Sequence, residues 1–282
     1  MGAEKSASLV WTDTHLDDCS WGSDMISSRR LAVSAVALAV LGALLPACHG
    51  PGNGGFVFDW NIWGYKGNTA YNPDVVSALV NTISAQDPKP QYIMLQEVCS
   101  NQLAQLAAQL PEYSSASYLQ HPLGKPNCQS FGNAMFFLGN ADSVSYGLYP
   151  VNPNYEQRGY VCNVATVGGR SDIKACSTHL DLDASSSAQA TYMRTTVAPH
   201  IAAGDYNITP GHSGTAALND YRNNGWTEAT SGAGELSTSS TTDGGSRRDY
   251  IWFRAPFTAD LLARITPRAE SDHHTYEGWS ST

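Results

Sequence analysis

Short apolar segments that end in polar residues are the feature of this sequence that most constrains its fold. Tyr92–Leu95 is an uninterrupted apolar run with the length of a buried strand, and Gln96 and Glu97 follow it directly. Similar strands are predicted at residues 56–61, 132–138, 160–167, 172–178, 201–205 and 249–253, and helices at residues 72–86, 101–110 and 188–197. Residues 219–246 are predicted to be loops. Strands that alternate with helices indicate an α/β protein, whose functional side chains collect at one edge of the strands.

Length and charge restrict the classes of protein that fit. The chain has 282 residues, 42% of them hydrophobic, so it can bury a large core in one α/β domain or two small ones. Its formal net charge of −9 argues against a protein that coats nucleic acid by charge alone. The charge does not exclude an enzyme that meets a phosphate through a divalent cation, because the metal then supplies the positive charge.

The N-terminal region has the pattern of an export signal. Arg29 and Arg30 precede an apolar run, Leu31–Leu45, which is too short for a comfortable membrane span, so residues 25–48 are predicted to be a signal peptide. Residues 1–24 are either an extension upstream of the true start at Met25, which we favour, or an unusually long polar leader. Residues 49–55 are predicted to be a Gly-rich linker, and residues 56–282 the folded domain.

Cys48 leaves two forms of the exported protein open. Leu45–Cys48 resembles a bacterial lipoprotein cleavage box, in which the cysteine carries the lipid. Ordinary cleavage near Ala47 is the alternative. The protein is accordingly predicted to be secreted, or else anchored by lipid at the bacterial cell surface, and to be a monomer.

Four cysteines of the predicted domain are expected to form two disulfides. Residues 160–178 read as a hairpin around Gly168 and Gly169, and Cys162 and Cys176 are equidistant from Gly169. They should therefore face each other, which leaves Cys99 to pair with Cys128. Free buried thiols are the alternative. Zinc binding is not expected, because the sequence contains no Cys-x-x-Cys motif.

Polar residues that begin or end predicted strands form the candidate site. Each has a simpler explanation by itself, such as a turn at Asp205 or a helix start after Glu97. Together they suggest one chemistry, because carboxylate and amide oxygens suit Mg²⁺ or Mn²⁺ and an Asp can orient a catalytic His. The set comprises Asn61, Glu97, His179, Asp205, Asn207, Asp249, Asp272 and His273.

Six short motifs in this order resemble the endonuclease/exonuclease/phosphatase superfamily, the deoxyribonuclease I-like fold. The motifs are Trp60–Gly64, Leu95–Glu97, Ser177–Leu180, Gly204–Asn207, Asp249–Ile251 and Ser271–His273. The resemblance implies an α/β fold, a four-layer sandwich of two packed mixed β-sheets flanked by helices. It also implies metal-dependent cleavage of a phosphoester.

The resemblance assigns a metal site to three residues. Glu97 would be the main metal ligand, with Asn61 beside it and Asp272 near the metal. Mg²⁺ or Mn²⁺ is the expected ion, and a structural Ca²⁺ is a further option. Arg158 stands where such enzymes often place a side chain that contacts the phosphate.

Five residues match the catalytic positions of the family. Asp205 would hold or deprotonate the attacking water, and Asn207 would contact the phosphate. His273 would be the catalytic histidine, oriented by Asp249, and His179 would donate a hydrogen bond to a phosphate oxygen.

The substrate class is less restricted by the sequence. A secreted nuclease that cuts DNA or RNA is the leading hypothesis, and Arg247 and Arg248 could contact flanking phosphates or form a solvated pair. A sphingomyelinase-like or inositol-phosphatase-like phosphoesterase is one alternative. A catalytically inactive exported binding or toxin-subunit protein is the other, because the short connection Pro199–Ile201 is expected to shorten or distort the strand that leads to Gly204.

Overall fold

The computed structural model describes residues 54–66, 70–151, 156–182, 185–229 and 239–281. The chain divides into two units, residues 1–47 and 48–282, and every described residue belongs to the second. The predicted leader at residues 1–48, Cys48 included, and most of the predicted linker therefore lie outside the described residues. Within the described residues, no helix has both the length and the apolar character that a membrane span requires.

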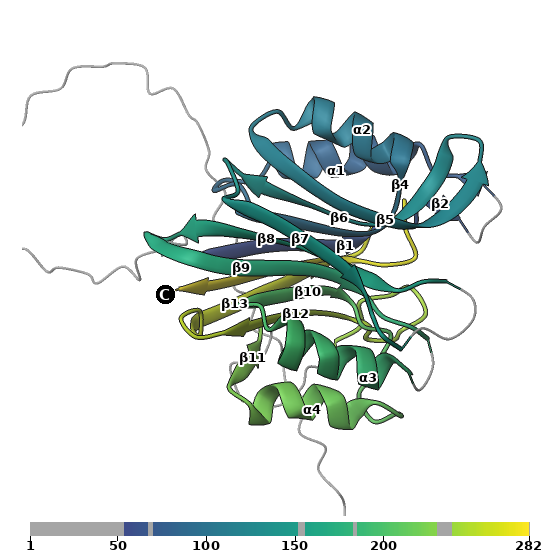
Figure 1. Cartoon of the computed structure of the whole chain (residues 1–282). Helices are drawn as coiled ribbons and strands as arrows, with labels where there is room; N and C mark the ends of the chain where they lie inside the picture. The colour runs from purple at the N-terminus through teal and green to yellow at the C-terminus, as the bar shows by residue number, and fades with distance from the viewer. Residues whose placement is uncertain (1–53, 67–69, 152–155, 183–184, 230–238, 282) are drawn as a thin grey trace, which may run out of the picture. The chain divides into compact units, whose positions relative to one another are not determined.

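Two six-stranded mixed sheets form the centre of the domain (Figure 1). In spatial order, the first sheet contains β13 (Ala259–Thr266), β14 (Thr275–Ser281), β1 (Gly55–Asn61), β4 (Tyr92–Cys99), β6 (Cys128–Leu138) and β5 (Tyr113–Lys125). The second contains β11 (Trp226–Glu228), β12 (Asp249–Arg254), β10 (Ile201–Asp205), β9 (Arg170–His179), β8 (Gly159–Val167) and β7 (Ser143–Leu148). A small ribbon of β2 (Tyr65–Lys66) and β3 (Ala70–Tyr71) follows β1.

Helices cover the outer face of each sheet (Figure 1). α1 (Asp74–Ser84) and α2 (Ser100–Gln109) pack against the first sheet, where Val75 and Leu106 join the buried residues Phe58 and Leu95. α3 (Ser185–Tyr192), the π-helical turn η1 (Met193–Val197) and α4 (Thr215–Asn223) pack against the second sheet. The order helices, sheet, sheet, helices is the predicted four-layer α/β sandwich, which is therefore confirmed.

The layer between the two sheets decides where polar groups lie. Side chains alternate along a strand, so every second residue faces this layer. On β10, Ile201 and Ala203 belong to the inter-sheet core and Asp205 follows two positions later. On β4, Tyr92 and Met94 belong to it and Gln96 follows. The inner faces therefore change from apolar to polar toward one end of the domain.

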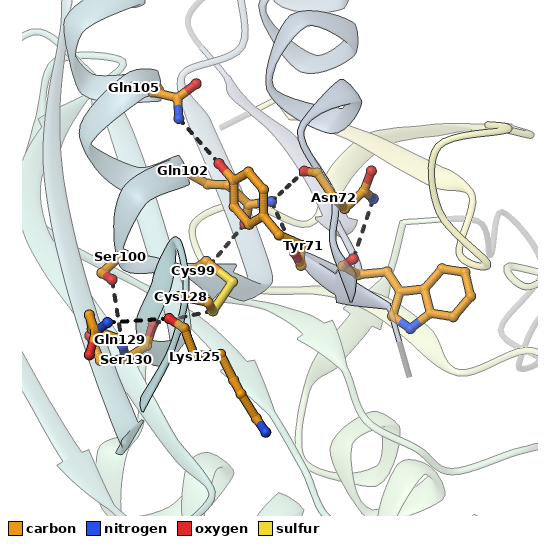
Figure 2. Close-up of a disulfide and its surroundings, with 12 residues drawn as sticks. Tyr71, Asn72, Cys99, Ser100, Gln102, Gln105, Lys125, Cys128, Gln129 and Ser130 are labelled. Atoms are coloured by element: carbon orange, nitrogen blue, oxygen red, sulfur yellow. Dashed lines mark hydrogen bonds between the residues drawn. A yellow bond between two sulfur atoms is a disulfide. The ribbon is translucent and has the colours of Figure 1, made fainter. Parts of the chain in front are cut away.

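The predicted hairpin and both disulfides are confirmed. β8 and β9 pair with Cys162 opposite Cys176, and these two residues are bonded. Cys99 at the end of β4 is bonded to Cys128 at the start of β6 (Figure 2). The second disulfide thus ties two neighbouring strands of the first sheet together.

The prediction of loops at residues 219–246 is wrong in part, and four strands were missed. Part of residues 219–246 is regular, because α4 covers Thr215–Asn223 and β11 covers Trp226–Glu228. Asparagine-rich α4 has weak helix propensity, and burial of Leu218 and Tyr221 against the second sheet stabilises it. The strands β5, β7, β13 and β14 were also not predicted from the sequence. Three of them, β5, β7 and β13, are edge strands, and β14 lies next to the edge strand β13.

The expected distortion before Gly204 is absent. β10 is a buried five-residue strand that pairs along its whole length with β9 on one side and β12 on the other. Ala198 adopts a left-handed conformation with φ of 48°, which lets η1 turn directly into the strand. The amide of His200 then donates to the carbonyl of Lys174 at 2.7 Å. A short connection therefore leaves the central strand regular.

Candidate active site

Three neighbouring strands place His179, Asp205 and Asp249 in one row. Asp205 at the end of β10 pairs with His179 at the end of β9 and with Asp249 at the start of β12. All three side chains are almost fully buried. Gly204 makes the close packing possible, because a Cβ at this residue would lie 1.9 Å from the carbonyl oxygen of Thr178. The backbone register itself therefore brings these residues together.

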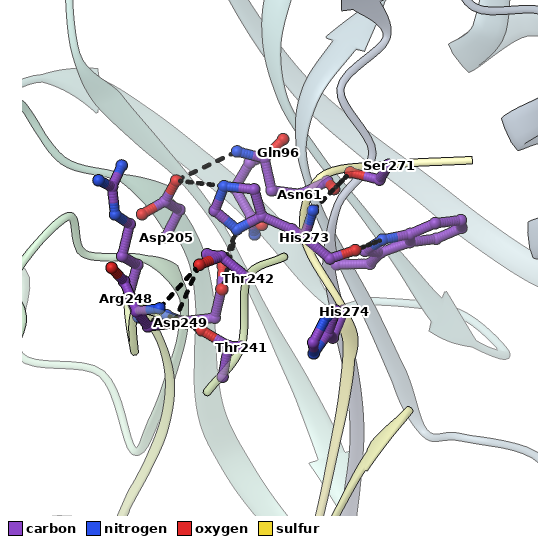
Figure 3. A network of polar contacts seen from close by, with 12 residues as sticks. Asn61, Gln96, Asp205, Thr241, Thr242, Arg248, Asp249, Ser271, His273 and His274 are labelled. Carbon is purple, nitrogen blue, oxygen red and sulfur yellow. Dashed lines mark hydrogen bonds and ion pairs between the residues drawn. The ribbon is translucent and has the colours of Figure 1, made fainter. Parts of the chain in front are cut away.

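His273 joins this row from the loop before β14 (Figure 3). Its Nδ1 lies 2.9 Å from Oδ2 of Asp249, and its Nε2 lies 3.6 Å from Oδ2 of Asp205. The indole of Trp60 donates to the carbonyl of His273 at 2.9 Å and fixes its backbone. One carboxylate therefore orients the imidazole, while the other nitrogen faces Asp205.

Hydrogen-bond donors from other elements converge on the carboxylate of Asp205. Oδ2 of Asp205 lies 3.1 Å from Nδ2 of Asn61 and 3.3 Å from Nε2 of His179, besides the contact with His273. Oδ1 accepts a hydrogen bond of 2.9 Å from the amide of Asn207. Three nitrogen atoms are thus grouped around a single carboxylate oxygen.

The ionisable groups of the site shift one another's pKa values. Burial raises the pKa of the Asp205 carboxyl, but His179 and His273 outweigh it and hold the pKa below its ordinary value. Burial lowers the pKa of His273, but Asp249 and Asp205 outweigh it and raise the pKa to about 10. Burial raises the pKa of Asp249, and His273 opposes this rise. At neutral pH, His273 is therefore an imidazolium, and it lies between the carboxyl groups of Asp205 and Asp249.

Asn61 and Glu97 lie on the other side of Asp205. Asn61 ends β1, and Glu97 stands at an irregularity in β4 with a left-handed φ of 57°. The amide nitrogen of Asn61 contacts both Oε1 of Glu97 and Oδ2 of Asp205 at 3.1 Å. The oxygen of Asn61 accepts from the amide of Trp63. In this arrangement Asn61 orders the two carboxylates.

Asn207 is held by a second set of contacts. Its φ is 52°, another left-handed value at the site, and such strain persists only where the surroundings fix it. Its side-chain nitrogen donates to the carbonyl of Leu180 at 3.0 Å and lies 3.2 Å from Nε2 of His179. Arg248 donates to its side-chain oxygen at 3.2 Å. Asn207 therefore links His179 to the guanidinium of Arg248.

Two groups of residues could hold a metal ion. Asp205, Asp249 and His273 bring one ligand atom each to within 4.8 Å of one another, but Nδ1 of His273 already contacts Asp249. The half-buried Glu97, with Asn61, offers the oxygen atoms that Mg²⁺ or Mn²⁺ prefers. Burial raises the pKa of Glu97, and His179 lowers it only in part. Burial makes the ionised form of Glu97 costly, and a bound divalent cation would stabilise that form.

Asp272 and Arg158 occupy the margins of the site. The charge of Asp272 helps to raise the pKa of His273, and its carbonyl accepts from the amide of Asp243 at 2.9 Å. Arg158 is buried and pairs with Glu156 at 3.2 Å. Arg158 precedes Gly159, which pairs with His179. Their predicted roles as metal neighbour and phosphate contact stay predictions.

Residues that support the site were missed in the sequence. The buried hydroxyl of Thr241 accepts from the amides of Arg248 and Asp249 at 3.0 and 3.1 Å (Figure 3). The hydroxyl of Ser271 donates to the carbonyl of Asn61 at 2.8 Å and accepts from the amide of His273. Thr241 has no local signal, because hydroxyl residues are common in loops, whereas Ser271 belongs to the motif Ser271–His273 but was given no role of its own.

Arg247 and Arg248 differ more than the sequence suggested. Arg247 is buried, forms an ion pair with Glu228 and packs its guanidinium against the rings of Tyr250 and Tyr276. It is therefore neither a solvated charge nor placed to meet a phosphate. Arg248 alone of the pair reaches the site.

Comparisons with known proteins match this geometry. The model of the endonuclease/exonuclease/phosphatase family matches residues 60–273. A search of curated proteins gave no match. The human nocturnin catalytic domain with bound sulfate is 17% identical, with a TM-score of 0.63 over 81% of this chain and 93% of that one. D. rerio TDP2 in complex with a single-strand DNA product is 16% identical, with a TM-score of 0.63 over 81% and 99%. A Bacteroides vulgatus endonuclease/exonuclease/phosphatase is 16% identical, with a TM-score of 0.61 over 81% and 98%.

Proposed function

Because the chain belongs to the endonuclease/exonuclease/phosphatase family, we propose that it is a divalent-metal-dependent endonuclease that hydrolyses phosphodiester bonds of DNA or RNA. The observation that carries this proposal is the convergence of Asn61, His179 and His273 on Oδ2 of Asp205. The nitrogen atoms of these three side chains surround Oδ2 of Asp205 and stabilise its negative charge. The single-strand DNA product bound to the similar D. rerio TDP2 supports a nucleic-acid substrate.

Asp205 is proposed to orient the attacking water. Its low pKa keeps the carboxylate ionised at neutral pH, so it accepts a hydrogen bond from water but is a weak base. Holding the water in line with the phosphorus atom removes much of the entropy barrier of a bimolecular reaction. The low pKa therefore favours the orienting role over removal of a proton in the ground state.

The imidazole groups are proposed to stabilise charge on the phosphate. His273 is cationic at neutral pH, since its pKa is raised to about 10, and it is held in place by Asp249. Nε2 of His179 lies 3.3 Å from Oδ2 of Asp205, and the side-chain nitrogen of Asn207 lies 3.2 Å from that Nε2. Donors that are already oriented stabilise developing charge in a buried site, and removal of one typically costs about 10²–10³ in rate.

Glu97, with Asn61 beside it, is proposed to hold the metal ion, and Asp272 is proposed to lie near it. When bound, a divalent ion would polarise a phosphoryl oxygen and neutralise negative charge there. The turned amide of Asn61 means that this side chain would have to rotate before its oxygen could become a ligand. Arg158 is proposed to contact the phosphate after release from Glu156.

Export is part of the same proposal. The two disulfides of the domain suit an oxidising compartment, and they support a secreted or lipid-anchored protein. Intact-mass analysis of the exported protein tests the anchor, because a lipidated Cys48 would carry a diacylglycerol adduct. Absence of the adduct would exclude the anchored form.

The purified protein should nick plasmid DNA in the presence of Mg²⁺ and fail to do so in the presence of EDTA. Sphingomyelin and inositol phosphates, assayed in parallel, test the other phosphoester classes. Addition of Mg²⁺ or Mn²⁺ in excess over EDTA should restore nicking. Hydrolysis of a lipid or inositol phosphate alone would contradict the nuclease, and no hydrolysis of any substrate would indicate an inactive binding protein.

A further inference from the structure

The row of residues that contains the site continues outward to the edge of the second sheet. His179 pairs with Gly159 on β8, and Gly159 pairs with Leu148 on the edge strand β7. Neighbouring strands are about 4.8 Å apart, so Gly159 lies roughly 5 Å and Leu148 roughly 10 Å from His179 along this row. Gly159 is buried and Leu148 is exposed, so this row reaches solvent at the edge strand β7.

An aromatic ring stands over the first step of this path. A Cβ added to Gly159 would lie 3.0 Å from Cε1 of Tyr118, which comes from β5 at the edge of the other sheet. Gly159 thus leaves the space that the ring of Tyr118 occupies, one strand away from His179. The side chain of Tyr118 thus reaches from the first sheet to the backbone of the second, one strand away from His179.

Tyr146 extends this aromatic surface into solvent. The rings of Tyr118 and Tyr146 stack with centroids 4.9 Å apart and an interplanar angle of 19°. Tyr146 is 60% exposed, which is high for a large apolar side chain. We call the stacked pair Tyr118 and Tyr146 the aromatic platform. The stack begins over Gly159, the strand partner of His179, and its outer ring, Tyr146, faces solvent.

On β7 the neighbours of Tyr146 lack charge. Val144 and Leu148 are exposed and share the side of β7 on which Tyr146 lies, since they are two positions away from it. β7 has the sequence Ser-Val-Ser-Tyr-Gly-Leu, with no ionisable side chain other than the tyrosine. Exposed apolar surface next to an active site is a feature of substrate subsites.

We propose that the aromatic platform stacks an unpaired base of a single-stranded nucleic acid whose cleaved phosphate lies at Asp205 on β10, three strands away from Tyr146 on β7. The inference rests on the proposed nuclease function and extends it to a preference for single strands. An aromatic ring takes any base by stacking, because every base has a π-face, and the stacking itself needs no net positive charge. This suits a chain with a net charge of −9. A lipid tail is less favoured, because the platform belongs to two paired strands and does not protrude as a loop.

Kinetics with single-stranded oligonucleotides test the platform. Tyr146→Ala should raise KM for a single-stranded oligothymidylate by about 5- to 100-fold, the range that loss of one base stack produces. Tyr146→Phe should recover most of this loss, because the ring is retained. With an abasic oligonucleotide of the same length, Tyr146→Ala and the wild-type protein should differ much less. Leu262→Ala, 62% exposed on the far edge strand β13, is the matched control and should behave as the wild type.

Binding of a fluorescent oligothymidylate in EDTA, measured by anisotropy, separates the platform from the nuclease. Equal cleavage and binding by Tyr146→Ala and wild type would overturn the platform and leave the nuclease intact. Binding that depends on Tyr146 without any cleavage would support the platform and refute the nuclease. Failure of the wild type to bind, or dependence on Tyr146 only with sphingomyelin vesicles, would overturn the base-stacking site.

Discussion

The two ends of the layer between the sheets are built from the same strands and have opposite properties. At one end, Met94 of β4 and Ile251 of β12 are fully buried among apolar side chains. At the other end, Gln96 and Asp249 occupy the same faces of the same strands and are equally buried. Alternation alone thus directs both sets inward. The difference shows that burial of a strand face does not determine whether it serves stability or chemistry.

The polar end is stabilised only through its partners. Asp205 is surrounded by donors from β1, β9 and two loops, so its charge is compensated. The charge of Asp59, behind the site, is compensated less completely. Gln96 donates a hydrogen bond to one of its carboxylate oxygens. Burial, together with the nearby Asp249, raises the pKa of Asp59 well above its ordinary value. Buried polar groups of this kind usually reduce stability. The apolar end therefore has to supply the free energy that keeps the groups of the candidate site in place.

The polar end should control rate and not stability. Asp205→Asn should lower the rate of Mg²⁺-dependent phosphodiester hydrolysis by about 10²–10⁴-fold, because the carboxylate that we propose orients water is lost. His273→Ala should act in the same direction. The melting temperature should change little by comparison. Asp220→Asn, an exposed carboxylate on α4, is the control, and near-normal turnover in both site variants would remove the catalytic assignment.

The apolar end should show the reverse behaviour. Met94→Ala should lower the free energy of unfolding by about 2–5 kcal/mol, because it leaves a cavity between the sheets. Turnover per folded molecule should stay close to that of the wild type. Urea denaturation and a nuclease assay on the same preparation measure both quantities. A rate loss as large as that of Asp205→Asn would show that the two ends are not separable.

The hairpin disulfide should stabilise the domain without acting on the chemistry. Cys162 and Cys176 are 14 residues apart, and a cross-link that closes such a loop contributes about 3 kcal/mol. The paired replacement Cys162→Ala with Cys176→Ala should lower the melting temperature accordingly. An unchanged melting temperature would indicate that pairing of β8 with β9 already restricts the unfolded chain.

The smallest effect is expected at the start of β10, at the opposite end from Asp205. Burial lowers the pKa of His200, and Arg254 acts in the same direction, so the unfolded state binds this proton more tightly. Stability should therefore fall as the pH decreases below about 6.5, the ordinary pKa of histidine. Melting temperatures between pH 7 and pH 5 should decrease less in His200→Gln than in the wild type. Identical slopes would exclude the contribution of His200.

Local patterns were sufficient for several features. The run Tyr92–Leu95 predicted a buried strand because its apolar character is independent of its neighbours. The disulfide between Cys162 and Cys176 was predicted because both residues belong to one hairpin. The strand β14 was missed, since its polar sequence is buried by β1 and β13 from distant parts of the chain. Glu277 shows this clearly, because its carboxylate is buried and forms an ion pair with Arg264 of the neighbouring strand β13.

The sequence by itself determined which chemical groups end the strands, because apolar runs and the polar residues after them are local properties. It thereby determined the family and the candidates Asp205, Asp249 and His273. Only the tertiary structure decided that Asn61 turns its nitrogen toward two carboxylates and that Arg247 is buried while Arg248 reaches the site. These outcomes depend on partners that are far away in the sequence, and their geometry is fixed only when the two sheets pack together.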